Sequence, residues 1–256
     1  MNVALLLFGQ LRWMDNPHTA SSHHNHIINR YERVDIFGHF WTPEQTEKLT
    51  QSAHVKFEPS PSDPLAMEKI QQKYKFTDIK FSDPIQFDFA KTLYHKAKAR
   101  VWPDIYQDGW FESSNAFNNV LSQMYAVQGV AKLLDQHMLN NPTIKYDYVV
   151  ISRPDICIWD YPNFKFLYPG CFHLSNHHGR FPDLGFIYDP KFNIVFSELF
   201  NNTVNITDEE LYSLWEPNAE ALKFNSYRKY FGYDLMRPIP LPVRIVRGQD
   251  CRGTQW

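Results

Sequence analysis

The stretch YDYVVISRPDICIWD, residues 146–160, decides the fold. Its apolar run, residues 148–151, is rich in β-branched side chains, which is the pattern of a strand covered on both faces of a sheet. Pro154 ends the run, because proline has no backbone N–H and disfavours helix at the residue before it. A buried strand that delivers an acid, Asp155, to its carboxyl end is typical of an open α/β sheet with a ligand crevice. The alternative interpretation is an Arg153–Asp155 pair that only caps the strand.

A second apolar run, residues 3–8, predicts the first strand, in a central and parallel position. It is followed by the turn Gly9-Gln10-Leu11-Arg12. In a doubly wound fold this turn is where a nucleotide or phosphate binds, and a glycine there lets the ligand approach the backbone closely. The turn has neither the Walker pattern nor G-x-G-x-x-G, so by its sequence alone it does not define a nucleotide type.

The elements that follow continue an alternation of strands and helices. A helix is expected over residues 16–31, with Asn16 as its N-cap. Residues 34–41 predict the second strand, a helix is expected to begin at 42–44, and residues 55–57 predict a third strand. This order is that of the mononucleotide-binding half of an α/β fold.

The strongest helix in the sequence covers residues 114–139. Its apolar residues recur at steps of three and four, as in a helix packed on a sheet: Phe117, Val120, Leu121, Met124, Val127, Ala131 and Leu134. A second face carries the small and polar residues Asn118, Ser122, Tyr125 and Gly129. Such a face is expected either to line a ligand cleft or to be exposed to solvent.

Elsewhere the pattern is less regular. Residues 58–84 are rich in Pro, Ser, Asp and Lys and predict an irregular excursion or flap. Further predictions are helices over 87–101, 191–200 and 217–230, two short strands within 164–174 around a Pro-Gly turn, a strand after Asp183, and at best an edge strand over 235–246.

Composition excludes several classes of protein. The 26 Lys and Arg against 28 Asp and Glu leave a net charge of −2, without the basic patch of a nucleic-acid-binding protein. No segment has the roughly 18 consecutive apolar residues of a membrane span, and the first apolar run lacks the features of a signal peptide. Cys157, Cys171 and Cys251 have no zinc spacing and, being odd in number, no disulfide framework. We therefore expect a soluble cytoplasmic protein with reduced thiols.

The histidine cluster His23-His24-Asn25-His26 invites a metal interpretation. His23 and His26 are three residues apart and would share one helical face. No acidic residue stands beside them at ligand spacing, so we expect a solvated helix face instead.

Five stretches, taken in order, carry a resemblance to a known family. They read G-Q-x-R within residues 8–12, D-I-F-x-H-x-W over 35–41, N-x-x-x-S-Q-x-Y over 118–125, Y-D-Y-V-V-x-x-R-x-D over 146–155 and D-x-x-x-I within 183–188. Together they resemble small GT-A-type, nucleotide-sugar-dependent glycosyltransferases of bacteria and their viruses. The resemblance covers most of the chain, with another family helix expected around 215–231, although each motif alone is loose.

The resemblance implies a fold and an activity. The fold is a GT-A-like, Rossmann-type α/β domain with an open, mostly parallel sheet flanked by helices. Residues 1–256 would form one domain, with 1–57 as the nucleotide-binding half, 58–112 as a flap and a helix, and 113–256 holding the central strand, the donor and acceptor site and the C-terminal helices. The activity is hexosyltransferase-like transfer of a sugar to a glycan or other hydroxyl acceptor.

The resemblance also assigns site residues. Gly9, Gln10 and Arg12 would contact the nucleotide, and Asn118, Ser122 and Tyr125 would line the donor cleft. Asp183 lies where the family has an acid near the reaction centre, so in an inverting enzyme it would be the general base; capping of a loop or helix is its structural alternative.

One motif departs from the family. GT-A enzymes usually carry Asp-x-Asp, which holds Mg²⁺ or Mn²⁺ against the donor diphosphate. Here Arg153 takes the place of the first acid, so Asp155 would be the single close protein ligand of a divalent cation, or Arg153 would contact the phosphates directly. The alternatives to a transferase are a catalytically degenerate protein that binds carbohydrate or nucleotide, and a nucleotidyltransferase.

Overall fold

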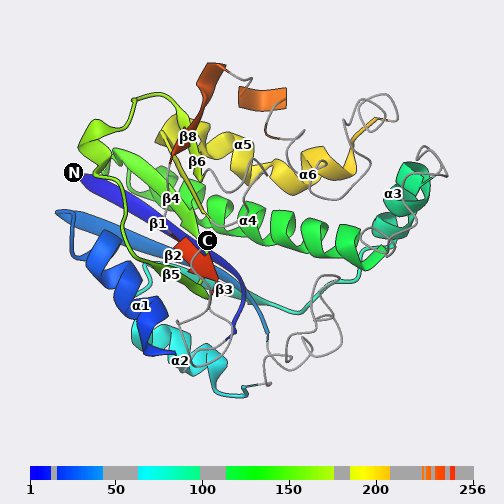
Figure 1. The fold of residues 1–256 in the computed structure, drawn as a ribbon, viewed down its shortest axis with the longest axis horizontal. Coiled ribbons are helices and arrows are strands. Elements are labelled where there is room, and N and C mark those ends of the chain that lie inside the picture. Colours follow the sequence, from blue (N-terminus) through cyan, green and yellow to red (C-terminus); the bar gives the residue numbers. More distant parts are fainter. Residues whose placement is uncertain are drawn as a thin grey trace.

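The computed structural model describes residues 1–12, 16–42, 63–98, 114–175, 185–207, 227, 229–231, 234–239 and 243–245. Their core is a seven-stranded sheet with helices on both faces, so the fold class is α/β (Figure 1). The strands of this sheet are β1 Asn2–Gln10, β2 Arg33–Trp41, β3 Asp78–Ser82, β4 Tyr148–Ser152, β6 Phe172–Ser175, β7 Gly185–Tyr188 and β8 Met236–Ile239. Two short strands, β5 Ile156–Ile158 and β9 Val243–Ile245, pair separately and antiparallel.

The sheet is open and mostly parallel. Its order is β3-β2-β1-β4-β7-β6-β8. The first four strands in this order pair in parallel, as do β6 and β8, whereas β7 is antiparallel to both of its neighbours. This arrangement is compatible with a Rossmann-like fold.

The helices connect these strands. They are α1 Pro17–His23, continued by the π-helical turn η1 His24–Ile28, then α2 Ala66–Lys73, α3 Asp88–Lys98, α4 Ser114–Asn140, α5 Asn193–Ser197 and α6 Leu199–Val204, with 3₁₀ turns at η3 Phe164–Phe166 and η4 Pro190–Phe192. As predicted, the side chain of Asn16 caps α1, accepting from the backbone N–H of His18 at 2.8 Å.

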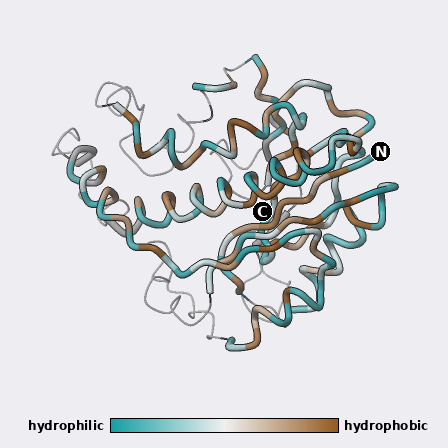
Figure 2. Tube along the Cα trace, turned by 180° about the vertical axis from the view of Figure 1, so that it is seen from behind, coloured by the Kyte–Doolittle hydropathy of each residue, from teal (hydrophilic) through white to brown (hydrophobic). Residues whose placement is uncertain are grey.

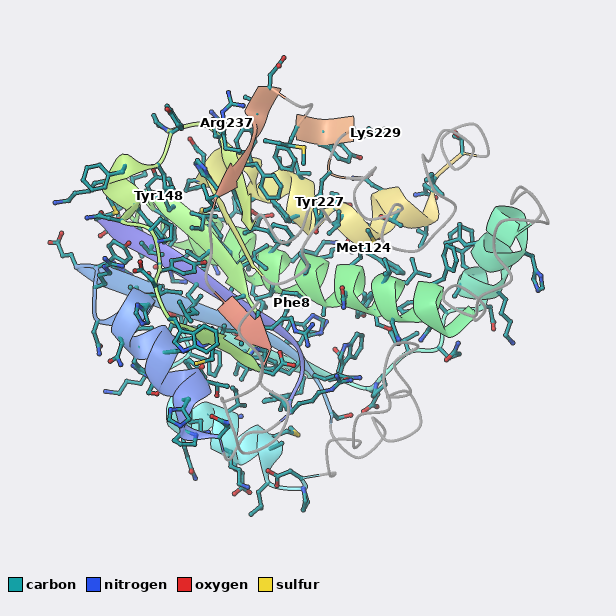
Figure 3. The ribbon with its side chains drawn as sticks, in the orientation of Figure 1. Phe8, Met124, Tyr148, Tyr227, Lys229 and Arg237 are labelled. Carbon is teal, nitrogen blue, oxygen red and sulfur yellow. The ribbon has the colours of Figure 1, made fainter. Side chains whose placement is uncertain are left out.

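Alternation along β1 builds two hydrophobic cores, one on each face of the sheet. Ala4, Leu6 and Phe8 pack toward α4, and Phe8 and Met124 lie on this side in Figure 3. The other side chains of the strand join α1 and α2 in the second core: Val3, Leu5 and Leu7. Figure 2 shows the hydrophobic residues concentrated in the strands at the centre. A strand with both faces buried is the expected centre of a doubly wound sheet.

Several predicted elements are confirmed. β1, β2 and β4 coincide with the predicted strands, α3 and α4 with the predicted helices, and β8 is an edge strand. Every residue of the apolar stripe on α4 is buried. The predicted strand at 55–57 and the helix start at 43–44 lie outside the described residues, as do Cys251 and most of 217–230.

Other predictions are wrong. The supposed irregular excursion 58–84 contains α2 and β3, where it is described. β3 is a sheet edge whose Ile79 and Phe81 pack on one face only, so it lacks the continuous apolar run by which central strands are recognised. Residues 164–174 hold a 3₁₀ turn and one strand rather than two strands; the chain turns at Gly170, which has φ +71°.

Candidate functional site

The candidate site lies where the order of strands reverses. From β1 the chain proceeds outward to β2 and β3, then returns through α4 to β4 on the other side of β1. Ligands of open α/β sheets bind outside the carboxyl ends of the strands at such a reversal. Leu7 pairs with Ser152, the last residue of β4, so the segments that follow both strands leave the same edge of the sheet side by side.

The end of β1 has two features of a binding segment. Gly9 has φ +104°, and no described atom lies within 4 Å of where its Cβ would be. The adjoining backbone is therefore open to a ligand. Gln10 is half-buried, and its Oε1 is buried without a hydrogen-bond partner among the described residues. Arg12, two residues on, is also half-buried.

The end of β4 is an ion-paired corner. Nε of Arg153 donates to Oδ1 of Asp155 at 2.9 Å, and Nη2 donates to Oδ2 at 2.6 Å. The Asp155 side chain is 2% exposed and the Arg153 side chain 16%. The backbone N–H of Ile156 donates to the carbonyl of Arg153 at 3.3 Å and closes the turn. The geometry is thus that of the capping pair named as an alternative above, and it places a guanidinium at the reversal point.

These donors do not fit a preformed metal site. A divalent cation such as Mg²⁺ takes oxygen ligands, commonly one or two carboxylates with water and phosphate, and both oxygens of Asp155 already accept from Arg153. In the part of the chain that the structure describes, no three His, Cys, Asp or Glu side chains gather as metal ligands. Asp155 as a metal ligand remains a prediction.

The polar face of α4 is turned inward. Asn118 is buried, and its Oδ1 accepts from the backbone N–H of Phe87 at 2.8 Å, which ties α4 to the segment before α3. The half-buried Tyr125 stacks on Trp41, with ring centroids 5.6 Å apart. Trp41 is the register partner of Gln10, so this ring pair lies one strand away from the end of β1. Ser122, between them on the helix, is half-buried.

A buried histidine network, which the sequence did not reveal, lies behind the corner. His23 is fully buried rather than on a solvated face as expected. Its Nε2 lies 3.1 Å from Oγ of Ser152, and its Nδ1 lies 3.0 Å from the carbonyl of Thr19 and 3.1 Å from the Tyr74 hydroxyl. A carbonyl only accepts, so the tautomer that satisfies both ends carries its proton on Nδ1 and accepts from Ser152. Burial lowers the pKa of His23 from 6.5 to about 4, although the charge of Asp155 opposes this shift. The cluster therefore packs α1 against the end of β4.

A second buried histidine supports the neighbouring strand. Nδ1 of His39 donates to the carbonyl of Ala126 at 3.2 Å, and Nε2 accepts from Oγ of Ser82 at 2.9 Å. Burial, with a smaller effect of the Lys80 charge, lowers the pKa of His39 to about 4. The side chains of His23 and His39 are therefore uncharged at neutral pH, and their hydrogen bonds support the packing of the helices on the sheet.

The third segment at this edge precedes β7. Gly185, the first residue of β7, pairs with Ser152 because the two strands are antiparallel. Asp183 itself lies outside the described residues. The chain two residues after it nevertheless reaches the edge where β1 and β4 end.

Comparison with known proteins adds no identity: neither a protein-family model nor a curated protein sequence matches this chain. Among the described helices, none combines the length and the apolar character needed to cross a bilayer.

Proposed function

We propose that this chain is a nucleotide-sugar-dependent glycosyltransferase with a GT-A-like fold. It transfers a sugar, of the hexosyl type, from a nucleotide-sugar donor to a hydroxyl group of a glycan or other acceptor. One observation carries the proposal: the end of β1, the end of β4 and the start of β7 meet at the reversal of strand order, which is where open α/β sheets bind nucleotides. The ordered family-like motifs supply the expectation of a sugar donor.

The end of β1 suits the nucleotide part of the donor. No atom of the described residues lies within 4 Å of a Cβ position on Gly9, which permits close approach of a phosphate or ribose to the backbone. Oε1 of Gln10, which has no hydrogen-bond partner among the described residues, is an acceptor for an N–H or O–H of the nucleoside. Arg12 adds a guanidinium at the same edge of the sheet, and a guanidinium forms strong charge-assisted hydrogen bonds with phosphate. On the β2 side, Asn118, Ser122 and Tyr125 of α4 would line the donor cleft, where Tyr125 stacks on Trp41.

The chemistry assigned to the site is a substitution at the anomeric carbon. The bond from that carbon to the diphosphate oxygen breaks, and its electron pair leaves with the nucleoside diphosphate. The acceptor oxygen forms the new bond, and its proton passes to a general base, for which we assign Asp183 in an inverting reaction. The pairing of Gly185 with Ser152 supports this assignment, because it brings the chain near Asp183 to the donor edge.

The test is a thermal-shift screen of nucleoside diphosphates and nucleotide-sugars. A ligand at about 100 times its dissociation constant stabilises the folded state by about 2.7 kcal/mol, which moves the melting temperature measurably. We expect one base to raise the melting temperature and its nucleotide-sugar to do so as well. If no nucleotide shifts the melt with EDTA, Mg²⁺ or Mn²⁺, the proposal is wrong.

Product analysis separates this function from the alternatives. A glycosyltransferase releases nucleoside diphosphate in step with a glycosylated acceptor, whereas a nucleotidyltransferase releases pyrophosphate. Nucleotide binding without either product identifies a binding protein. The Arg153–Asp155 pair favours the binding protein in one respect, because it takes the place of the acidic motif that is expected of an active enzyme.

A further inference from the structure

We infer that the donor diphosphate is held without a metal ion, by the guanidinium of Arg153, which Asp155 holds in position. This inference rests on the proposed nucleotide site and specifies how that site handles charge. It makes Arg153 a binding residue and Asp155 a positioning residue.

Asp155 is committed to its ion pair with Arg153. Both of its carboxylate oxygens accept charge-assisted hydrogen bonds, at 2.9 and 2.6 Å, and the side chain is 2% exposed. To ligate a divalent cation it would have to give up these bonds and leave a guanidinium beside the new charge. Separation of a buried ion pair and repulsion between two cations both oppose that exchange.

The guanidinium of Arg153 is suited to bind a diphosphate. A guanidinium is charged at all relevant pH values, and its planar donors match the oxygens of a phosphate. Its side chain is 16% exposed, so it lies on the outer side of the pair, with Asp155 beneath it. At the neighbouring strand end Arg12 places a second guanidinium on the same edge of the sheet.

Hydrogen bonds hold the Arg153–Asp155 corner from several sides. Ser152, before Arg153, bonds to the buried His23, and the turn closes from Ile156 to Arg153. Beyond the corner, the backbone N–H of Ile158 donates to Oγ of Ser22 on α1 at 3.0 Å. A charge fixed in this way needs no reorganisation when the diphosphate leaves, which is the condition for electrostatic stabilisation of a transition state.

The experiment is titration calorimetry with a panel of nucleoside diphosphates, in excess EDTA and in Mn²⁺. For the wild-type chain we expect the same dissociation constant in both. In the double variant Arg153→Gln/Asp155→Asn, both charges are removed together, so no unpaired charge is left in the buried corner, and both positions stay polar. We expect binding to weaken roughly 10- to 100-fold, the loss of a hydrogen bond to a charged group. Asp155→Asn alone keeps the cation and should weaken binding less.

The matched control is a second arginine–aspartate pair with the same spacing. Arg33 donates to Asp35 at 2.8 Å at the start of β2, on the opposite edge of the sheet. Arg33→Gln/Asp35→Asn should leave diphosphate binding unchanged.

The possible results test metal independence, the role of Arg153 and the nucleotide site separately. Binding by the wild-type chain that EDTA abolishes and Mn²⁺ restores overturns the metal-free inference and leaves the nucleotide site intact. Binding by the double variant at wild-type strength, with a cooperative melt, overturns the role of Arg153. If no diphosphate binds in any condition, the proposed function fails together with the inference.

Discussion

The imidazole of His39 fills the space that a side chain at position 129 would occupy: a Cβ on Gly129 would lie 1.9 Å from Nδ1 of His39. The glycine thereby allows α4 to approach β2 until Nδ1 reaches the carbonyl of Ala126, one turn earlier on the helix. Gly129 belongs to the face of α4 that the sequence presented as small and polar. In the structure, Gly129 is required for the close packing of α4 on the sheet beneath the candidate site.

Gly129→Ala should therefore destabilise the protein although alanine favours helix. Overpacking costs about 3 kcal/mol in such a site, and the higher helix propensity of alanine returns about 1 kcal/mol. We expect a net loss of about 2 kcal/mol in the free energy of unfolding, measured with urea. In a His39→Ala background the same substitution should stabilise instead, because the clash is gone. Equal costs in the two backgrounds would contradict the close approach as the cause.

Acid should unfold the protein through its two buried histidines. The pKa of His23 and that of His39 are lowered from 6.5 to about 4 in the folded state, so between these values the unfolded chain binds more protons. Stability is complete above pH 6.5 and falls as the pH drops toward 4. Each histidine should cost about 2 kcal/mol by about pH 5, relative to neutral pH.

The measurement is urea unfolding at neutral pH and at about pH 5, for the wild-type chain and for the variants His23→Gln and His39→Gln. Each variant should show a smaller loss on acidification, because one titrating group is removed. NMR titration of the imidazole protons provides the direct reading. A folded-state midpoint near 6.5 for His23 would rule out its part in the effect.

Substitution of Asn193, in the core under β7, should destabilise the protein. Its Nδ2 donates to the carbonyl of Ala131 at 2.9 Å and to Asp135 at 2.6 Å, and its Oδ1 accepts from the buried Tyr188 hydroxyl at 2.9 Å. Asn193→Ala leaves that hydroxyl without its acceptor and should lower the free energy of unfolding by about 3 kcal/mol. The exposed Asn205 is the control, and its alanine variant should stay within about 0.5 kcal/mol of wild type. Equal melting curves for the two variants would contradict the role of Asn193.

Asp183→Asn tests the general base. Loss of a general base lowers turnover roughly 10²- to 10⁴-fold, and nucleotide affinity should not change because the assigned role concerns the acceptor. Turnover is followed as nucleoside diphosphate released from the donor that the thermal-shift screen identifies. The exposed Asp160 supplies the control, and Asp160→Asn should react at the wild-type rate. Undiminished turnover in Asp183→Asn would remove Asp183 from the mechanism.

The sequence predicts those elements whose burial is uniform. β1 and β4 are continuous apolar runs because both of their faces are covered, and α4 shows its stripe because one face meets the sheet. β3 escaped recognition because an edge strand is only half covered. β5 and β9 have three residues each and pair only with one another, which leaves no periodic pattern to read.

The strand ends that form the candidate site were predictable from the sequence, but the bonds between their side chains were not. Strand ends such as Gly9 to Arg12 and the Arg153–Asp155 corner can be read from runs and turns, since topology brings them to one edge. The burial of His23 cannot be read in this way, because its partners Ser152 and Tyr74 are distant in sequence and only the folded chain brings them together. The polar residues beside His23 therefore suggested a solvent-exposed helix face, whereas in the structure His23 is hydrogen-bonded in the interior.

The pairing of β1 with β4 also has a kinetic consequence. The backbone N–H of Asn2 bonds to Asp147, 145 residues further along the chain, so this contact closes a very long loop. Contacts of such separation cost much entropy to form and are slow to establish during folding. We therefore expect the candidate site to be completed late in folding, after the β1–β2 unit and α4. A ligand that bridges the two strand ends would then slow global unfolding, and hydrogen exchange at the centre of the sheet would report its binding.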